Sequence, residues 1–324
     1  MGAYPTSGES VARRAGPAHL STPATGTPAP GRTAAAAAGL EAVERLLAAR
    51  GVAVLSGAGL STESGIPDYR GATGSRRRGT PMTYQEFTGS EAARRRYWAR
   101  SHIGWRAITG AEPNAGHRAV EALRRSGHVS SVITQNVDGL HRAAGTADAV
   151  ELHGGLDRVV CLGCRRTSPR AGLDRRLEAL NDGFREAQAP LNPDGDVELA
   201  DERVAAFRVA PCEACGGVLK PDVVFFGEAV PKERVERCYR LVDGARALLV
   251  LGSSLSVLSG LRFVRHAARS GRPVAIVNRG TTRGDDLAVA TVALPLGSAL
   301  TALAHHLTPS AGAPTAEAPS TERT

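Results

Sequence analysis

Short apolar runs alternate along the chain with longer stretches in which apolar residues recur at helical spacing. Four such runs stand out: Val52–Leu55, Val132–Thr134, Ala247–Leu251 and Val274–Val277. In the stretch before the first run, Leu40, Val43 and Leu47 fall on one face of a helix. Continuous runs of Val, Leu and Ile between helices are typical of parallel strands covered on both faces. The pattern therefore predicts an α/β fold with a doubly wound parallel sheet.

Each of the four runs ends in polar or glycine residues rather than in an ordinary turn. These endings are Ser56-Gly57-Ala58-Gly59, Gln135-Asn136-Val137-Asp138, Gly252-Ser253-Ser254 and Asn278. Ligands of open α/β sheets bind beyond the carboxyl ends of the strands. The sequence therefore predicts that these four loops line one shared crevice.

The first loop, Gly57-Ala58-Gly59, has the character of a phosphate cradle. Glycines let the backbone approach a pyrophosphate, and the free amides of a following helix would favour an anion. Thr62 occupies the position where a dehydrogenase fingerprint has a third glycine or alanine, so an ordinary dehydrogenase fits poorly. A plain strand-to-helix turn is the alternative for this loop taken alone.

The wider set of motifs is more specific. Residues 56–71 read Ser-Gly-Ala-Gly-Leu-Ser-Thr-Glu-Ser-Gly-Ile-Pro-Asp-Tyr-Arg-Gly, and Thr134–Asp138, His153-Gly154 and Gly252–Ser254 follow in order. Together these blocks resemble the sirtuins, the NAD-dependent protein-lysine deacylases, over about residues 40–305. The resemblance implies that the chain binds NAD through a set of matching positions. They are Gly57, Ala58, Gly59, Ser61, Ile66, Asp68, Tyr69, Arg70, Gln135, Asn136, Asp138, Gly252, Ser253, Ser254 and Asn278.

The same resemblance implies the catalytic residues. His153 is the expected general base, since an imidazole with a pKa near 6.5 can take a proton from a ribose hydroxyl at neutral pH. Asn136 and Asp138 are expected at the nicotinamide ribose, although a simple strand-end turn would also use these residue types. His141, four residues after Val137, is expected to be structural.

Two cysteine pairs, Cys161-x-x-Cys164 and Cys212-x-x-Cys215, form a second constellation. Four thiolates in two knuckles suit a structural zinc ion, and two unrelated redox pairs are the alternative. Sirtuins carry such a zinc, and the long separation of the pairs is similar to their class II branch, which includes the mitochondrial lipoamidase. Cys238 is expected to be a small buried side chain on a helix.

The segment from Lys220 to Glu228 is strongly apolar and could be a core strand. The resemblance instead implies that it receives acylated lysine side chains of proteins, with Val224, Phe225, Phe226 and Gly227 against the substrate. Tyr97 and Arg100, one helical turn apart, are similar to a pair that holds the carboxylate in the branch that recognises succinyl groups. Their register differs by about one turn, and an arginine on a basic helix needs no ligand. We expect acetyl-lysine to be processed, but a longer or acidic acyl group to react faster.

Composition indicates where the domains begin and end, and the distribution of charge argues against nucleic-acid binding. Residues 1–37 and 309–324 are rich in Ala, Pro, Gly, Ser and Thr, which predicts disordered tails. Residues 38–155 and 220–305 are expected to form the NAD-binding domain, and residues 156–219 an inserted zinc-binding lobe. The +8 net charge comes mostly from nine arginines between Arg70 and Arg106, so nucleic-acid binding is disfavoured.

Free cysteine pairs and the lack of a long apolar run point to a cytoplasmic protein with no membrane role. Two other functions stay open at this point. A mono-ADP-ribosyltransferase could use the same NAD pocket, and a non-catalytic module that senses NAD or binds nucleic acid could retain the motifs.

Overall fold

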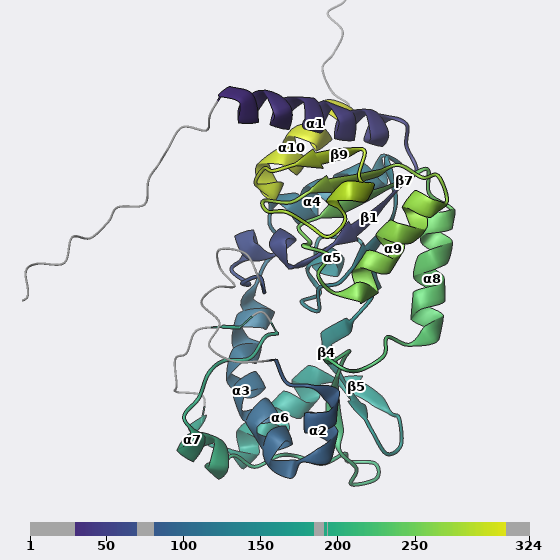
Figure 1. Cartoon of the computed structure of the whole chain (residues 1–324). Coiled ribbons are helices and arrows are strands. Elements are labelled where there is room, and N and C mark those ends of the chain that lie inside the picture. Colours follow the sequence, from purple (N-terminus) through teal and green to yellow (C-terminus); the bar gives the residue numbers. More distant parts are fainter. Residues whose placement is uncertain (1–29, 70–80, 185–190, 193, 309–324) are drawn as a thin grey trace, which may run out of the picture.

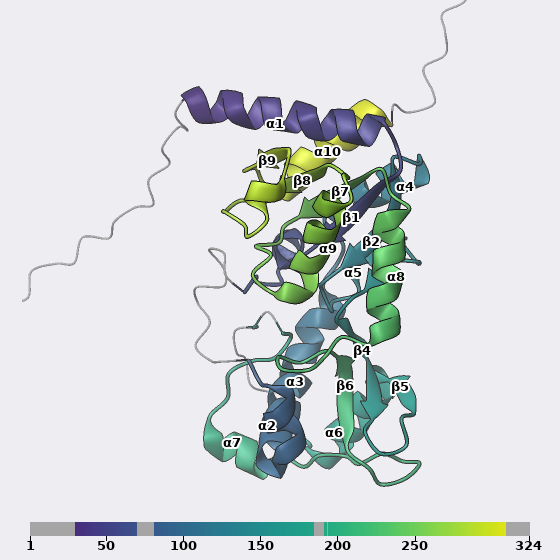
Figure 2. The same cartoon turned by 45° about the vertical axis from the view of Figure 1, so that its right-hand side comes forward.

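The computed structural model of the chain describes residues 30–69, 81–184, 191–192 and 194–308. Figures 1 and 2 show an upper part built around a parallel sheet and a lower part built around a smaller, antiparallel sheet. Arg70 and most of the two predicted tails lie outside the described residues.

The upper part contains, among the described residues, six parallel strands in the order β3-β2-β1-β7-β8-β9. Their bounds are β1 Val52–Ser56, β2 Val129–Thr134, β3 Val150–Glu151, β7 Ala247–Leu251, β8 Val274–Val277 and β9 Ala290–Val292. The four apolar runs of the sequence are β1, β2, β7 and β8, which confirms the predicted α/β fold. The strand order reverses between β1 and β7, so the topological switch point, where such sheets bind ligands, lies there.

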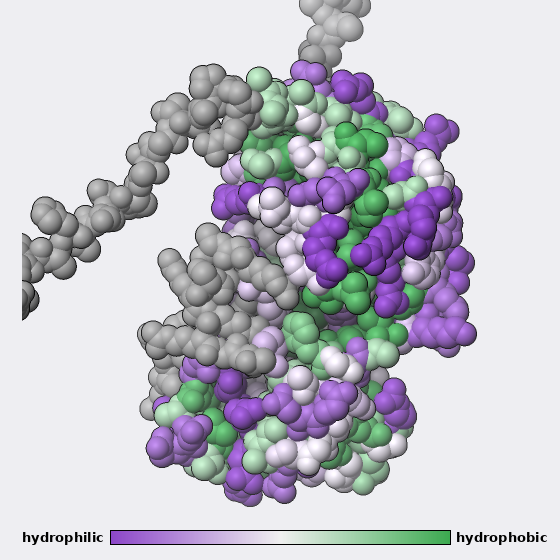
Figure 3. Space-filling view, in the orientation of Figure 1, coloured by the Kyte–Doolittle hydropathy of each residue, from purple (hydrophilic) through white to green (hydrophobic). Residues whose placement is uncertain are grey.

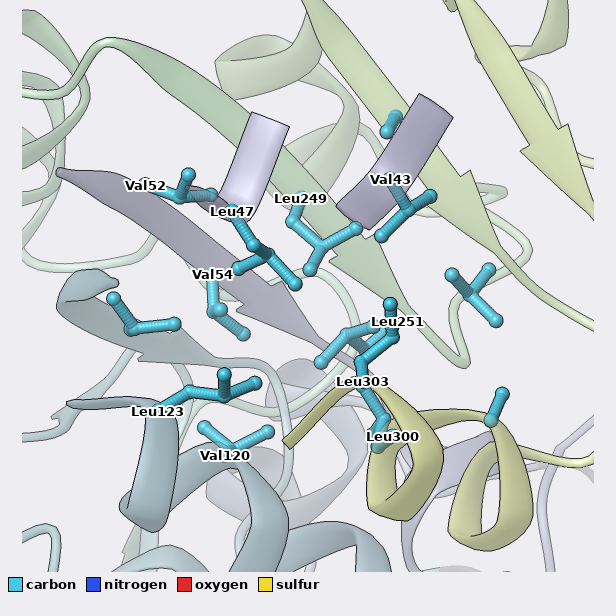
Figure 4. Packing of buried hydrophobic residues seen from close by; sticks show 14 of the residues in the cluster. Val43, Leu47, Val52, Val54, Val120, Leu123, Leu249, Leu251, Leu300 and Leu303 are labelled. Carbon is cyan, nitrogen blue, oxygen red and sulfur yellow. The ribbon is translucent and has the colours of Figure 1, made fainter. Parts of the chain in front are cut away.

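Helices cover both faces of this sheet because successive strand residues point to opposite sides. Val52 and Val54 pack with α1, α4 and α10 on one side, and Figure 4 shows this cluster. Ala53 and Leu55 pack with α8 and α9 on the other. The helix bounds are α1 Pro30–Ala48, α4 Ala115–Arg125, α5 Leu140–Ala143, α8 Lys232–Asp243, α9 Leu258–Arg269 and α10 Leu296–Leu307.

The lower part, which we call the small lobe, takes in more of the chain than residues 156–219. Its sheet has the order β5-β4-β6, and its core joins residues of α2 and α3 to those of α6. The bounds are β4 Gly154–Cys161, β5 Thr167–Pro169, β6 Leu219–Val223, α2 Tyr84–Gly89, α3 Glu91–Gly110, α6 Arg170–Leu180 and α7 Asp201–Ala206. Helices α2 and α3 belong here because Phe87 and Trp98 are fully buried against the lobe.

The first helix also begins earlier than composition suggested. Helix α1 starts at Pro30, within the segment predicted as a tail. Alanine is the strongest helix former and proline is tolerated in the first turn, so the run of alanines extends the helix toward the N-terminus. None of the helices in the described ranges combines the length and apolar character that a bilayer crossing requires.

Two histidines are buried together between α4 and α5. The rings of His117 and His141 lie 5.1 Å apart, and His141 Nε2 is 2.8 Å from the Ser56 hydroxyl at the end of β1. Neither nitrogen of His117 has a hydrogen-bond partner among the described residues. Burial lowers the pKa of His117 to about 3 and that of His141 to about 4. Both rings are therefore neutral in the folded protein, which agrees with a structural role for His141.

This pair predicts a loss of stability in acid. Below pH 6.5 the unfolded chain takes up protons at these rings and the folded chain does not, down to about pH 4. As the pH falls through this range, each ring lowers the free energy of unfolding by about 1.4 kcal/mol per pH unit. We expect His117→Leu to lose less stability than the parent between pH 6 and pH 5 in urea unfolding, and the exposed His305→Leu to behave as the parent. Equal losses in the parent and His117→Leu would contradict this account.

Candidate functional site

A cavity of about 1070 Å³ lies at the carboxyl ends of β1, β2, β7 and β8. Its walls come from the sheet on one side and from the small lobe on the other. All four polar loops of the sequence reach it, as predicted. Figure 3 shows apolar side chains (green) at the waist between the two parts, on the face that is turned to the viewer.

The cavity floor is a contact between two glycine loops. A Cβ on Gly57 would lie 2.8 Å from the carbonyl oxygen of Gly252, and one on Gly59 would lie 2.9 Å from Gly252 Cα. Gly252 has φ of +63°, and its carbonyl accepts a 2.8 Å hydrogen bond from the Gly59 amide. Glycine is required at each position, so the loop after β1 lies directly against the loop after β7.

The segment after this loop differs from the sequence expectation. It forms two 3₁₀ turns, Ala58–Leu60 and Thr62–Ser64, and not an α-helix. Gly65, with φ of +84°, ends the second turn. An anion at this loop would therefore lack the dipole of a long helix.

A buried network joins the first loop to the loop after β2. The Asn136 side-chain amide donates to the Gly57 carbonyl and to the Ser61 hydroxyl, both at 3.0 Å. The Ser61 hydroxyl in turn donates to Asp138 at 2.7 Å, and the Leu140 amide donates to the other oxygen of that carboxylate at 2.9 Å. Burial nevertheless raises the pKa of Asp138. These contacts fix Asn136 and Asp138 as part of the cavity wall.

Gln135 joins the loop after β2 to the loop after β7. Its side-chain amide donates to the Ser253 hydroxyl at 2.8 Å. The Ser254 hydroxyl lies 3.0 Å from that of Ser256, and the Asn278 amide donates to the Gly280 carbonyl at 2.7 Å. The amide side chains of Gln135 and Asn278 and the hydroxyl groups of the loop after β7 thus lie along one wall.

His153 precedes β4 and lines the same cavity. Its Nδ1 lies 2.9 Å from the carbonyl oxygen of Gln135, and its Nε2 lies 2.8 Å from the hydroxyl of Ser259. Burial lowers the pKa of His153, and the nearby Arg234 lowers it further. The imidazole is therefore neutral at pH 7, the state in which it can accept a proton.

The structure brings nearly all the predicted site residues to this cavity. Those of the expected cofactor set are Gly57, Ala58, Gly59, Ser61, Ile66, Asp68, Tyr69, Gln135, Asn136, Asp138, Gly252, Ser253, Ser254 and Asn278. Val224, Phe225, Phe226 and Gly227 line it from the small-lobe side, as does Tyr97. Lys220 to Glu228 is not one strand, since β6 ends at Val223 and Glu228 folds back to donate to the Phe225 carbonyl.

Arg100 is the exception. It is not among the residues that line the cavity. Its guanidinium lies 3.1 Å from Asp196 and 2.6 Å from Glu198, and it also donates to the Val197 carbonyl. Arg100 therefore links α3 to the loop before α7 through ion pairs, and it is not a receptor for a substrate carboxylate.

Several cavity residues were not singled out from the sequence. Ile108 and Leu156 add apolar surface, and Asp194 and Asp196 add acidic side chains from the small lobe. Leu258 and Ser259 come from the start of α9. Asp194 and Asp196 belong to the stretch Asn192–Asp196, which is similar to the class II branch, but the sequence assigned no site role to any of these residues. Each reaches the cavity through packing between elements that are distant along the chain.

The four predicted metal ligands form one cluster. The Sγ atoms of Cys161, Cys164, Cys212 and Cys215 all lie within 4.8 Å of one another, at 3.5 Å for Cys161–Cys215 and 3.8 Å for Cys164–Cys212. Four sulfurs around a tetrahedral zinc ion stand about 3.8 Å apart. The Cys164 amide points at Cys161 Sγ and is the largest of several causes that lower the pKa of that thiol, while the pKa of its neighbour Cys215 is raised. The donor set fits zinc, and two separate redox pairs do not fit this geometry.

A match to the Sir2 family covers residues 57–259. The chain belongs to the Sir2 family. This range starts at the first glycine loop and ends at Ser259, so it includes the cavity loops of β1, β2 and β7, and also the cysteine cluster.

Relatives support the same membership. NAD-dependent protein deacetylase 1 of Streptomyces coelicolor is 66% identical over 268 residues, which are 83% of this chain and 90% of the relative. The Mycobacterium avium protein of the same name is 53% identical, over 82% of this chain and 94% of the relative. A solved Sir2 complex with a p53 peptide and NAD⁺ superposes with a TM-score of 0.66 and 28% identity, over 82% of this chain and 98% of that one.

The cysteine cluster of this Sir2 chain yields a prediction about folding. We expect one zinc ion per chain by metal analysis, and we expect Cys161→Ala to be insoluble, because a structural zinc contributes folding energy. Cys238→Ala is the matched control, since Cys238 is equally buried but lies in α8, away from the cluster. It should stay soluble and keep its zinc. A soluble, active and metal-free Cys161→Ala protein would contradict a structural zinc.

Proposed function

We infer that this chain is an NAD-dependent protein deacetylase. The observation that carries the inference is one cavity in which the glycine loops, Asn136, Asp138 and the neutral His153 meet. Relatives that are 66% and 53% identical over more than four fifths of the chain are NAD-dependent protein deacetylases. The reaction moves the acyl group of a lysine to the ADP-ribose part of NAD and releases nicotinamide.

We propose that NAD lies along the wall made by the loops of β1, β7 and β8. The loop Gly57–Gly59 suits the pyrophosphate, because the missing side chains let it approach the backbone. The amides of Gly57 and Gly59 donate to the Leu251 and Gly252 carbonyls, so the Ala58 amide is the one that we place at the phosphates. Ser253, Ser254 and Asn278 are placed to hold the riboses. Ile66 and Asp68 also line the cavity and are proposed to hold the nicotinamide, since the Asp68 carboxylate can accept a hydrogen bond from its amide and Ile66 offers apolar surface.

His153 supplies the base in this proposal. A backbone carbonyl can only accept, so Nδ1 carries the hydrogen that points to Gln135. Nε2 then holds the lone pair and can take a proton from a ribose hydroxyl. Because the folded-state pKa of His153 lies below its ordinary value, this nitrogen stays free of protons at neutral pH.

Acylated lysine side chains of proteins are the proposed substrates, as in the solved Sir2 complex with a peptide. Phe226 is 39% exposed and Leu258 is 58% exposed, which is unusual for side chains of this size. Both line the cavity, one from each part of the molecule. We propose that the peptide backbone lies between them and that the lysine passes inward beside Val224 and Phe225. Four cysteines that serve as zinc ligands and not as disulfides suit the reducing cytoplasm, which we propose as the location.

The acyl end of the cavity favours chains longer than acetyl and disfavours acidic ones. Tyr97, Ile108 and Leu156 provide apolar surface there. Asp194 and Asp196 act on Tyr97 and line the same cavity, and burial raises the pKa of Asp196 to about 7. Arg100 is already paired with carboxylates, so a carboxylate on the substrate would find no receptor in it. The long insert that carries these aspartates supports placement in the class II branch, which we also propose.

The role of His153 can be tested directly. His153→Ala should lower the deacetylation rate by about 100- to 10,000-fold, because the general base is lost, and NAD should still bind. Mass spectrometry of an acetyl-lysine peptide measures the rate, and calorimetry measures NAD binding. His305→Ala, which removes an exposed imidazole outside the cavity, is the control. Full activity in His153→Ala would refute the assignment.

A panel of acyl peptides tests the acyl pocket. We expect a neutral acyl chain longer than acetyl to give a higher kcat/KM than acetyl. We expect succinyl to be at least about tenfold slower, because its charge would be desolvated beside Asp194 and Asp196. Arg100→Met should leave the ratio of succinyl to neutral rates unchanged. Acetyl as the fastest substrate would refute the length preference, and a succinyl rate that depends on Arg100 would restore the carboxylate role of that residue.

A further inference from the structure

Ser259 touches the catalytic base from an element that is far from it in sequence. It is the second residue of α9, and its hydroxyl oxygen lies 2.8 Å from Nε2 of His153. Both residues line the cavity, and Ser259 is partly accessible from it. The hydroxyl therefore occupies the side of the imidazole on which a ribose hydroxyl must arrive.

The direction of this hydrogen bond follows from the other side of the ring. Nδ1 carries the hydrogen because its partner is the Gln135 carbonyl, so the neutral ring has its lone pair at Nε2. The Ser259 hydroxyl is then the donor. When Nε2 takes up a proton, the same hydroxyl can rotate and accept from it, since a hydroxyl has both functions.

Helix α9 is held firmly in this place. A Cβ on Gly260 would overlap Oε1 of Gln135, so the first turn of α9 rests on the residue whose carbonyl orients His153. Gln135 also donates to Ser253, which precedes α9 by one loop. The ring is thus fixed from two sides by groups that are themselves connected.

We propose that Ser259 is a positioning residue for the general base. Its hydroxyl holds the ring with the Nε2 lone pair directed into the cavity. It turns aside when the ribose hydroxyl of bound NAD approaches Nε2, stays beside the ring, and accepts a hydrogen bond from Nε2 once that nitrogen is protonated. This proposal rests on the proposed role of His153. It assigns no step before nicotinamide leaves, because the base acts only after that step.

The test separates the base-dependent step from the earlier one. Ser259→Ala should lower kcat for deacetylation by about five- to tenfold, the effect of one lost hydrogen bond, and leave KM for NAD and peptide unchanged. Exchange of labelled nicotinamide into NAD should keep its rate. Ser259→Thr, which keeps the hydroxyl, should restore kcat. Ser298→Ala, in the first turn of α10 and outside this cavity, should match the parent in every assay.

A double-mutant cycle shows whether Ser259 acts through His153. In a His153→Ala background, Ser259→Ala should have no further effect on deacetylation. An equal loss in both backgrounds, or a parallel loss of nicotinamide exchange, would mean that Ser259 only supports the fold, and the proposal would be overturned. Thermal melting of each full-length variant identifies any that are unfolded. If Ser259→Ala is unfolded, ¹⁵N NMR of the folded Ser259→Thr variant is measured instead, and it must still show the hydrogen at Nδ1 of His153. A hydrogen at Nε2 would overturn the proposal. If His153→Ala alone keeps full activity, the assignment of the base fails and not only the role of Ser259.

Discussion

The close approach of two backbones at the switch point governs the site. Gly57 and Gly59 on one side and Gly252 on the other leave no room for a Cβ. The contact sets the distance between the loops of β1 and β7, and the side chains of Asn136 and Gln135 can then reach both of them. A larger residue at any of the three glycines would separate the loops and disconnect the polar network that follows.

The fold and most of the cavity follow from local patterns. Apolar runs such as Ala247–Leu251 predicted buried strands, and the polar residues after them predicted the edge where ligands bind. These inferences hold because the strands are buried on both faces and because parallel strands end at a common edge. The cysteine cluster was predictable for a similar reason, since two knuckles of fixed spacing can meet in one compact arrangement.

Other features depend on contacts between distant residues. Arg100 was expected to face a substrate, but its partners Asp196 and Glu198 lie almost a hundred residues further along the chain. The two 3₁₀ turns after β1 replace a helix because the loop is held against Gly252, which local propensity does not encode. The extension of the small lobe to α2 and α3 follows in the same way from the burial of Phe87 and Trp98.

Strand β4 links the two centres of the molecule. It begins at Gly154, directly after His153, and ends at Cys161, the first residue of the metal cluster. At Gly154 it runs so close to β6 that a Cβ would overlap the Asp222 carbonyl. The imidazole and the metal cluster are therefore joined by a single strand, whose length is about 25 Å. A compound that removes the metal would inhibit turnover without entering the NAD cavity, and raising the concentration of NAD or peptide would not overcome it.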